Sequence, residues 1–309
     1  MTSIELVLAD AAARLATALG LEPESARIEA RSLLAHALDR DRNWLALHAR
    51  DPLSEAGAAA FEALLARRLA GEPVAYLTGR REFFGLDFKI TPAVLIPRPE
   101  TELLVEQALE RLPADAPSRV LDLGAGSGCV AITLARHRPR AKVTAVDTSE
   151  AALAVARDNA RRLLGGGSPT HGVGVPSPLM GEGQGEGEES SFRLVLSDWF
   201  SALGDAKYVL VVSNPPYVAE GDPHLAQGDL RFEPRHALAA GADGLDCIRR
   251  IVRDAPAHLA EGGWLLFEHG YDQAEDCRNL LRGAGLQDIR SFRDLSGIER
   301  VSGARRLTP

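Results

Sequence analysis

Hydrophobic side chains recur at helical spacing through the first quarter of the chain. The first such stripe is Ile4, Leu8, Ala12, Leu15 and Leu19. Three later segments repeat the three- and four-residue spacing before Gly71 and Pro73 end the last one. The pattern predicts a helical bundle domain over residues 1–75, which would be either a packing appendage or a substrate-recruiting domain.

The pattern changes over residues 76–97. Short apolar runs at 82–84 and 87–90 flank Gly85-Leu86, which predicts a β-hairpin that connects two domains. A helix is predicted next, with Pro99 in its first turn and Glu100 and Glu102 at its positive end.

From Arg119 onward, buried-strand patterns alternate with helical ones. Strands are predicted at 120–123, 143–146, 192–196, 208–212 and 264–268, and helices at 130–135, 151–164, 247–259 and 273–284. Apolar ends near Ile289 and Val301 close the domain. This alternation predicts an α/β domain over residues 98–309, built on a mainly parallel sheet with helices on both faces. Residues 165–191 are rich in Gly, Ser, Pro and Glu, and we expect a disordered surface insertion there.

Composition narrows the class of partner and the compartment. The 309 residues carry a net charge of -8, which weighs weakly against a nucleic acid substrate. The three cysteines and the histidines show no metal-ligand spacing, so no metal is expected. No signal peptide and no run of roughly 20 apolar residues are seen, so we expect a cytoplasmic monomer that does not enter a membrane.

A glycine-rich segment follows the first predicted strand of the sheet. After Asp122 and Leu123 come Gly124, Ala125, Gly126, Ser127 and Gly128. The third glycine arrives one residue too early for the dinucleotide fingerprint. A preceding acidic residue with this spacing favours S-adenosyl-L-methionine, which has no pyrophosphate and needs a backbone cradle for its methionine portion.

Two further strand ends supply candidate cofactor contacts. Asp147 closes the second strand, where a carboxylate accepts hydrogen bonds from both ribose hydroxyls; the alternative is a helix N-cap, together with Ser149. Asp198 and Trp199 follow the third strand, where Trp199 would stack on adenine and Asp198 would take its exocyclic amine. The alternative for that pair is a core tryptophan beside a turn aspartate.

The segment Asn214-Pro215-Pro216-Tyr217 directly follows the fourth strand, beside the expected cofactor. An amide nitrogen is a poor nucleophile because its lone pair is delocalised. The Asn214 side-chain oxygen and the Pro215 carbonyl would orient its hydrogens and stabilise the developing positive charge. Pro216 helps to fix the backbone, and Tyr217 would cover the flat amide. An exposed turn is the alternative. Glu268-His269-Gly270 is interpreted as a strand end packed near the substrate channel rather than as part of a catalytic dyad.

Together these motifs resemble the release factor glutamine methyltransferases, the PrmC/HemK family. The motifs that carry the resemblance, besides those above, include Gly71-Glu72-Pro73, Arg81-Glu82-Phe83, 95–102, 197–200, 222–225 and 231–234. The resemblance implies a Rossmann-like seven-strand class I methyltransferase domain, an N-terminal helical domain and a connecting β-hairpin.

The resemblance also implies an activity and site roles. The reaction would be methyl transfer from S-adenosyl-L-methionine to the glutamine of the Gly-Gly-Gln motif in class 1 peptide chain release factors. Residues 124–128, Asp147, Trp199 and Asn214 would bind the cofactor, and Asn214 and residues 215–217 would hold the glutamine. The helical domain would then recognise the release factor. One alternative is a nucleic acid methyltransferase acting on adenine N6 or guanine N2, whose exocyclic amines pose the same chemical problem. The other is a non-catalytic binding module.

Overall fold

The computed structural model describes residues 2–165 and 191–307, so the predicted insertion lies almost wholly outside the described residues. Contacts divide the chain into two compact units. One comprises the residues up to Arg80 together with Ala226–Phe232, and the other comprises Arg81–Leu225 together with Glu233–Pro309.

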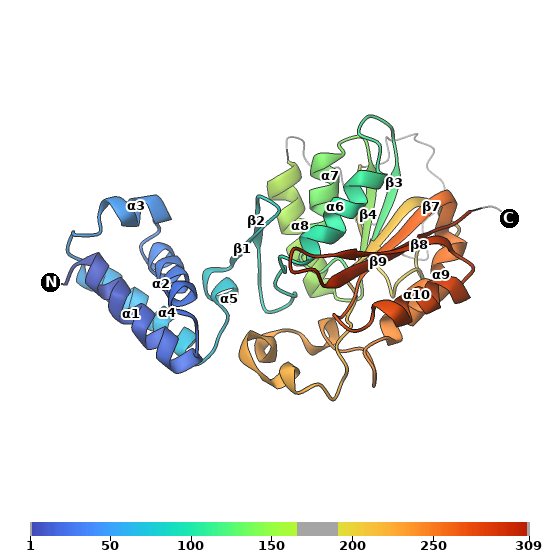
Figure 1. Cartoon of the computed structure of the whole chain (residues 1–309). Coiled ribbons are helices and arrows are strands. Elements are labelled where there is room, and N and C mark those ends of the chain that lie inside the picture. Colours follow the sequence, from blue (N-terminus) through green and yellow to red (C-terminus); the bar gives the residue numbers. More distant parts are fainter. Residues whose placement is uncertain (1, 166–190, 308–309) are drawn as a thin grey trace. The chain divides into compact units, whose positions relative to one another are not determined.

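Residues 2–80 of the first unit form a helical bundle, drawn from blue to cyan in Figure 1. Its helices are α1 (Ile4–Leu19), α2 (Pro23–Ala37), α3 (Arg42–Leu47), α4 (Glu55–Leu69) and α5 (Val74–Thr78). Side chains of Ser3, Asp41 and Ser54 accept backbone N–H groups at the starts of α1, α3 and α4, which satisfies donors that the helix itself leaves unpaired. Leu15, Leu33 and Phe61 are fully buried in the core. The N-terminal helical region predicted from the stripes is confirmed.

A buried guanidinium organises the end of this bundle. Arg68 forms ion pairs with Glu29 at 2.7 Å and Asp229 at 2.9 Å, and it also donates to the carbonyls of Gly71 and Glu72. Arg231 donates to the Ala70 carbonyl at 2.8 Å. These bonds explain why the distant segment Ala226–Phe232 belongs to the helical unit.

The hairpin is formed by β1 (Arg80–Phe83) and β2 (Leu86–Lys89). Its turn lies at Phe84-Gly85, one residue earlier than the sequence pattern indicates. Phe84 has φ 51° and Gly85 has φ 74°. A two-residue hairpin turn with positive φ at both central positions matches the twist of the flanking strands. The β-hairpin prediction is confirmed, and its turn position is corrected.

The second unit is built on a seven-stranded sheet. Its strands are β3 (Arg119–Leu123), β4 (Lys142–Asp147), β5 (Phe192–Leu196), β6 (Tyr208–Ser213), β7 (Leu259–Glu268), β8 (Gln287–Arg293) and β9 (Glu299–Arg305). The order is β5-β4-β3-β6-β7-β9-β8, and all neighbours are parallel except β9, which is antiparallel to β7 and β8. The seven-strand Rossmann-like prediction is therefore confirmed.

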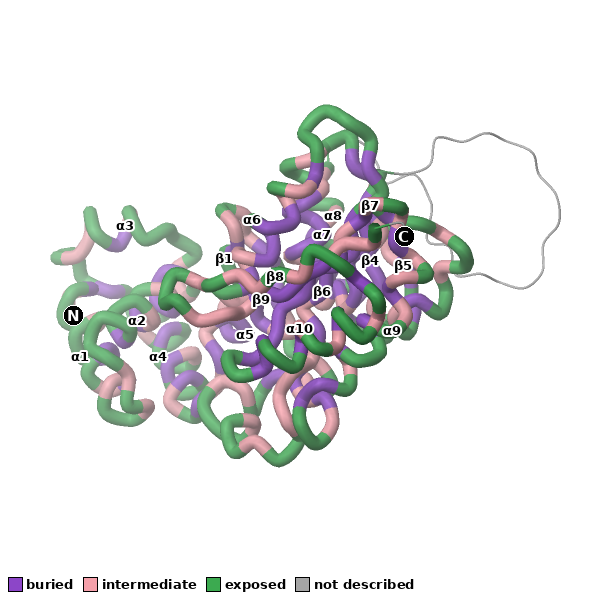
Figure 2. Tube along the Cα trace, turned by 45° about the vertical axis from the view of Figure 1, so that its right-hand side comes forward, coloured by how far each residue is buried: buried purple, intermediate pink, exposed green. Residues whose placement is uncertain are grey.

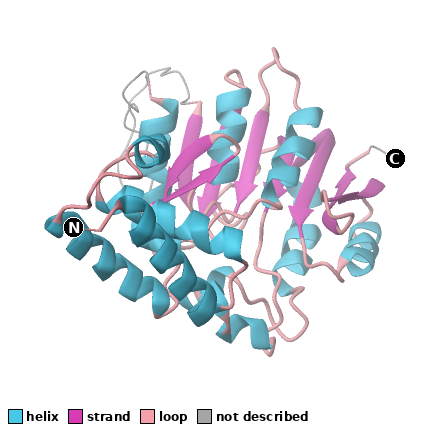
Figure 3. Cartoon of the chain, turned by 60° about the vertical axis from the view of Figure 1, so that its left-hand side comes forward, coloured by secondary structure: helices cyan, strands magenta, loops and turns pink. Residues whose placement is uncertain are grey.

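Helices cover both faces of this sheet, as Figure 3 shows. The helices α6 (Thr101–Arg111), α7 (Cys129–His137) and α8 (Glu150–Leu164) pack side by side, and α9 (Asp246–His258) packs with α10 (Ala274–Gly283). Burial follows from this layering: the central strand β6, which is buried at five of its six residues, is largely purple in Figure 2. Short 3-10 turns lie at Pro223–Ala226, Gly228–Phe232 and Arg235–Ala237.

Three details differ from the sequence prediction. The helix α6 starts at Thr101, so Pro99 precedes the helix instead of lying in its first turn. Strand β7 starts at Leu259, five residues before the predicted strand, because it continues directly from α9. The apolar ends near Ile289 and Val301 are an antiparallel pair of strands. Within the described residues, no helix is both long enough and apolar enough to cross a membrane.

Candidate active site

Strand order determines where a ligand can bind. The chain runs outward from β3 to β4 and β5, then returns to β6 on the other side of β3. Ligands in open α/β sheets bind at such a reversal, beyond the carboxyl ends of the strands. Ser213 Oγ donates to the Leu123 carbonyl at 2.7 Å, which fastens the ends of β6 and β3 together. A cavity of about 260 Å³ lies at this point.

Backbone bonds hold the glycine loop at one wall of the cavity. The N–H groups of Gly124 and Ala125 both donate to the Val146 carbonyl, at 2.9 and 2.8 Å. Gly124 has φ 78°, and a Cβ there would lie 3.7 Å from the Trp199 ring and 4.0 Å from the Asn214 carbonyl oxygen. The bare backbone therefore leaves open the space between two other residues that line the cavity.

Residues 124–127 all line the cavity, whereas Gly128 is not among the lining residues. Gly128 is the N-cap of α7, and a Cβ there would lie 2.8 Å from Ile132. Its conformation thus serves the packing of α7 below the loop. Ser127 Oγ is buried and has no hydrogen-bond partner among the described residues. A buried hydroxyl without a partner is costly unless a ligand satisfies it.

Two carboxylates of the cavity wall have different environments. Asp147 accepts from the N–H of Gly126 at 2.8 Å and from that of Ser149 at 2.9 Å. The N-cap of α8 is Ser149, so Asp147 does not cap that helix. Asp122 is 1% exposed and accepts from Ala131 N at 3.1 Å. Burial raises the pKa of Asp122 to about 7.

Trp199 also lines the cavity, and its backbone has a left-handed conformation, with φ 51°. A non-glycine residue adopts this conformation only when its surroundings enforce it. Ser197 Oγ enforces it by donating to the Trp199 carbonyl at 2.9 Å and accepting from Ala202 N at 3.1 Å. Asp198 also lines the cavity, but its carboxylate already forms a 2.7 Å ion pair with Arg250.

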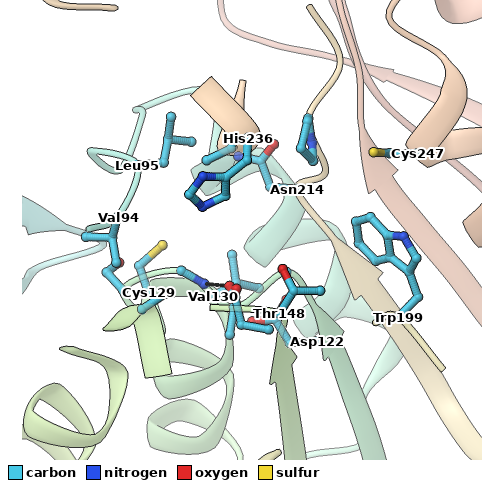
Figure 4. A pocket seen from close by; sticks show the side chains of 18 of the residues that line it. Val94, Leu95, Asp122, Cys129, Val130, Thr148, Trp199, Asn214, His236 and Cys247 are labelled. Atoms are coloured by element: carbon cyan, nitrogen blue, oxygen red, sulfur yellow. Dashed lines mark hydrogen bonds between the residues drawn. The ribbon is translucent and has the colours of Figure 1, made fainter. Parts of the chain in front are cut away.

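Asn214 and Pro216 line the cavity, whereas Pro215 and Tyr217 are not among its lining residues. Figure 4 shows Trp199 on one side of the cavity, Val94 and Leu95 on the other, and Asn214 between them. The Tyr217 carbonyl accepts from Gln273 Nε2 at 3.0 Å, which fixes the backbone after the two prolines.

Two polar residues beside Asn214 were not recognised from the sequence. Asn214 Nδ2 donates to Thr101 Oγ1 at 3.0 Å, and Thr101 Oγ1 donates to Glu268 Oε2 at 2.7 Å. Tyr217 OH donates to Glu268 Oε1 at 3.0 Å. Sequence analysis left Thr101 without a role and assigned Glu268 to strand-end packing. The sequence feature that indicates a site role is the position of Glu268 at the carboxyl end of a parallel strand, and it concerns Glu268 only.

Burial raises the pKa of Glu268 to about 7, although the bonds from Thr101 and Tyr217 oppose the shift. The charge of Glu268 holds the pKa of Tyr217 well above its usual range. His269 is buried between the Gly270 carbonyl and Ser302 Oγ, and burial lowers its pKa. It is not among the cavity-lining residues, which agrees with the packing interpretation for His269 itself.

A third buried carboxylate, that of Glu233, supports another part of the cavity wall. Glu233 accepts from the Ile96 N–H at 3.0 Å and pairs with the Arg98 guanidinium. These bonds fix the loop that places Leu95 and Pro97 at the cavity.

A seven-stranded sheet with a glycine loop after β3 and an Asn-Pro-Pro-Tyr segment after β6 defines a class I methyltransferase. Residues 7–79 match the model of the PrmC N-terminal domain, and residues 100–165 match that of the methyltransferase small domain. The chain is 52% identical to the release factor glutamine methyltransferase of Bordetella pertussis, over 91% of this chain and 96% of that protein. It is 53% identical to the protein of the same name from Burkholderia pseudomallei, over 90% of this chain and 91% of that protein. The chain belongs to the release factor glutamine methyltransferase family.

Solved structures agree on the fold. A methyltransferase from Pyrococcus furiosus superposes with a TM-score of 0.50 at 17% identity, over 79% of this chain and 98% of that one. At this identity the likeness shows the shared architecture alone.

Proposed function

We propose that this methyltransferase uses S-adenosyl-L-methionine to methylate the side-chain amide of the glutamine in the Gly-Gly-Gln motif of class 1 peptide chain release factors. The observation that carries the proposal is that Asn214 lines the same cavity as the glycine loop and Trp199. The names of the relatives support the choice of substrate.

The residues of the cavity fit this cofactor. The unpartnered Ser127 hydroxyl and the open space above Gly124 lie where the methionine portion would bind. Asp147 would accept from the ribose hydroxyls with the lone pairs that Gly126 and Ser149 leave free. Trp199 would stack on the adenine ring. The cofactor supplies an electrophilic methyl group on a positively charged sulfur.

The residues after β6 then act on the nucleophile. Asn214 Oδ1 and the Pro215 carbonyl would accept the two N–H groups of the substrate amide and turn its nitrogen toward the cofactor. Because these acceptors are fixed before the reaction, they stabilise the positive charge that develops on nitrogen without reorganising. The bond from the amide nitrogen to the methyl carbon would form as the sulfur–methyl bond of the cofactor breaks, which leaves a neutral thioether, and the methylated nitrogen would release one proton to water.

The proposal is tested by transfer of a radioactive methyl group from labelled cofactor to purified macromolecules. The substrates are a class 1 release factor, the same factor with its motif glutamine replaced by alanine, ribosomal RNA and DNA. Label on the intact factor alone is the expected result. Label on both factor variants would refute the assigned glutamine, and label on nucleic acid alone would establish the alternative methyltransferase function.

A further inference from the structure

A chain of hydrogen bonds joins Asn214 to a buried carboxylate. It runs from Asn214 Nδ2 to Thr101 Oγ1 at 3.0 Å, and from Thr101 Oγ1 to Glu268 Oε2 at 2.7 Å. Tyr217 OH occupies the second carboxylate oxygen at 3.0 Å. These four side chains therefore meet where the end of β6, the start of α6 and the end of β7 converge.

Counting protons fixes the direction of each bond. A carboxylate only accepts, so the single hydroxyl proton of Thr101 must point to Glu268. The Thr101 oxygen is then an acceptor toward Asn214, and only the NH2 side of the Asn214 amide matches it. The side-chain oxygen Oδ1 consequently points away from Thr101, and no described group donates to it.

We propose that Glu268 and Thr101 are positioning residues, which hold the Asn214 amide in the orientation that presents an acceptor to the substrate glutamine. This inference rests on the proposed function. A flipped Asn214 would turn its NH2 group toward the NH2 group of the substrate, and two donors repel each other. The loss of one oriented group at a reacting centre slows turnover by about 100-fold or more.

The full burial of the Glu268 carboxylate indicates that this residue does more than fill space in the core. Glu268 is 1% exposed and Thr101 is 2% exposed. The three residues before Glu268 in β7 are Leu265, Leu266 and Phe267, all fully buried. An apolar side chain in the same place would avoid the cost of burying a charge. The position therefore holds a carboxylate for the bonds that it accepts.

The same network predicts a response to pH. Thr101 and Tyr217 face Glu268 with hydrogen bonds, Arg300 stabilises its charge, and Glu100 opposes it. Burial raises the pKa of Glu268 to about 7. A proton on Oε2 would make Glu268 a donor to Thr101, whose own proton would then meet the Asn214 NH2 group. Turnover should therefore fall as the pH drops below about 7.

The first test compares two isosteric substitutions, Thr101→Val and Thr133→Val. Thr133 is fully buried in α7 and donates to the Cys129 carbonyl at 2.6 Å, but it has no contact with the network. We expect kcat for release factor methylation to fall about 10- to 100-fold in Thr101→Val only, with cofactor affinity unchanged within about threefold in both variants. The conservative variant Thr101→Ser should restore most of kcat, because it keeps the hydroxyl.

The second test is the pH profile of kcat at saturating substrates. Wild type should gain turnover as the pH rises through about 7, and Glu268→Gln should be slow and lose that rise. Equal kcat in wild type and Thr101→Val would overturn the inference. If Thr101→Val does not fold, an unchanged pH profile in Glu268→Gln would overturn it independently. A wild-type protein that labels no release factor would overturn the proposed function instead, so the two failures are distinguishable.

Discussion

Asn159 offers the sharpest test of how the fold supports the cofactor loop. It is fully buried in α8. Its Oδ1 accepts from Lys89 N at 2.7 Å, and its Nδ2 donates to the carbonyls of Lys89 at 3.0 Å and Ser127 at 2.9 Å. One side chain thus fastens both the hairpin strand β2 and the glycine loop to the same helix.

Asn159 Oδ1 also accepts from Arg162 at 3.2 Å, so replacing this residue, Asn159→Ala, removes four hydrogen bonds and leaves three backbone groups unpaired. A lost intramolecular bond costs about 0.5–1.5 kcal/mol, so we expect the free energy of unfolding to fall by about 2–4 kcal/mol. Cofactor affinity should fall by up to about tenfold, because the Ser127 carbonyl loses its anchor. Asn159→Asp should lose at least as much, since a carboxylate has no N–H for the two carbonyls.

Urea unfolding followed by circular dichroism measures the stability, and calorimetric titration measures the affinity. Asn279→Ala is the matched control, because Asn279 is an exposed residue of α10. The control should change stability by less than about 0.5 kcal/mol. If Asn159→Ala is no more destabilising than Asn279→Ala, the anchoring role assigned to this side chain is wrong.

Three further substitutions test other parts of the account. Because burial raises the pKa of Asp122 from 3.8 to about 7, its protonated form stabilises the folded state, and this contribution is lost as the pH rises from about 4 to about 7. Asp122→Asn should therefore gain stability relative to wild type as the pH rises from about 5 to about 7, by roughly 3 kcal/mol, because each pH unit between the two pKa values changes the wild-type stability by about 1.4 kcal/mol. A stability difference in urea unfolding that does not change with pH would contradict this. Arg68→Ala should destabilise the helical unit by about 3–5 kcal/mol, because it leaves buried charged partners unpaired. Arg67→Ala breaks a half-exposed ion pair and should cost under about 1 kcal/mol. Equal losses of stability in thermal unfolding would contradict the larger role assigned to the buried ion pair. Gly124→Ala should weaken cofactor binding at least about tenfold, because a Cβ strains a left-handed residue by about 1–2 kcal/mol and occupies space in the glycine loop where the cofactor would bind. Calorimetric titration measures this affinity, and a wild-type value would contradict the position assigned to the cofactor.

The sequence was most informative where local patterns and burial coincide. Strands such as β3 and β6 are covered on both faces, so they form continuous apolar runs that stand out from helical stripes. The glycine loop and Asn214 were found for a related reason: both directly follow such a strand.

What the sequence did not reveal depends on distant or unusual contacts. Thr101 and Glu268 are 167 residues apart, so no local spacing links them. Strand β9 has few apolar residues, and its Gly303 lies against Leu266 so closely that a Cβ would be 2.3 Å away. The hairpin turn was misplaced because Phe84 adopts a positive φ that is rare for a bulky residue.

The central claim is that a glutamine side chain of a release factor receives the methyl group. Tandem mass spectrometry of the Gly-Gly-Gln peptide, after incubation of the factor with this protein and S-adenosyl-L-methionine, tests it most directly. We expect one methyl group on the side-chain nitrogen of that glutamine, and none after an incubation of the same length with the Asn214→Ala variant. An unmodified glutamine, or a methyl group on another residue of the factor, would contradict it.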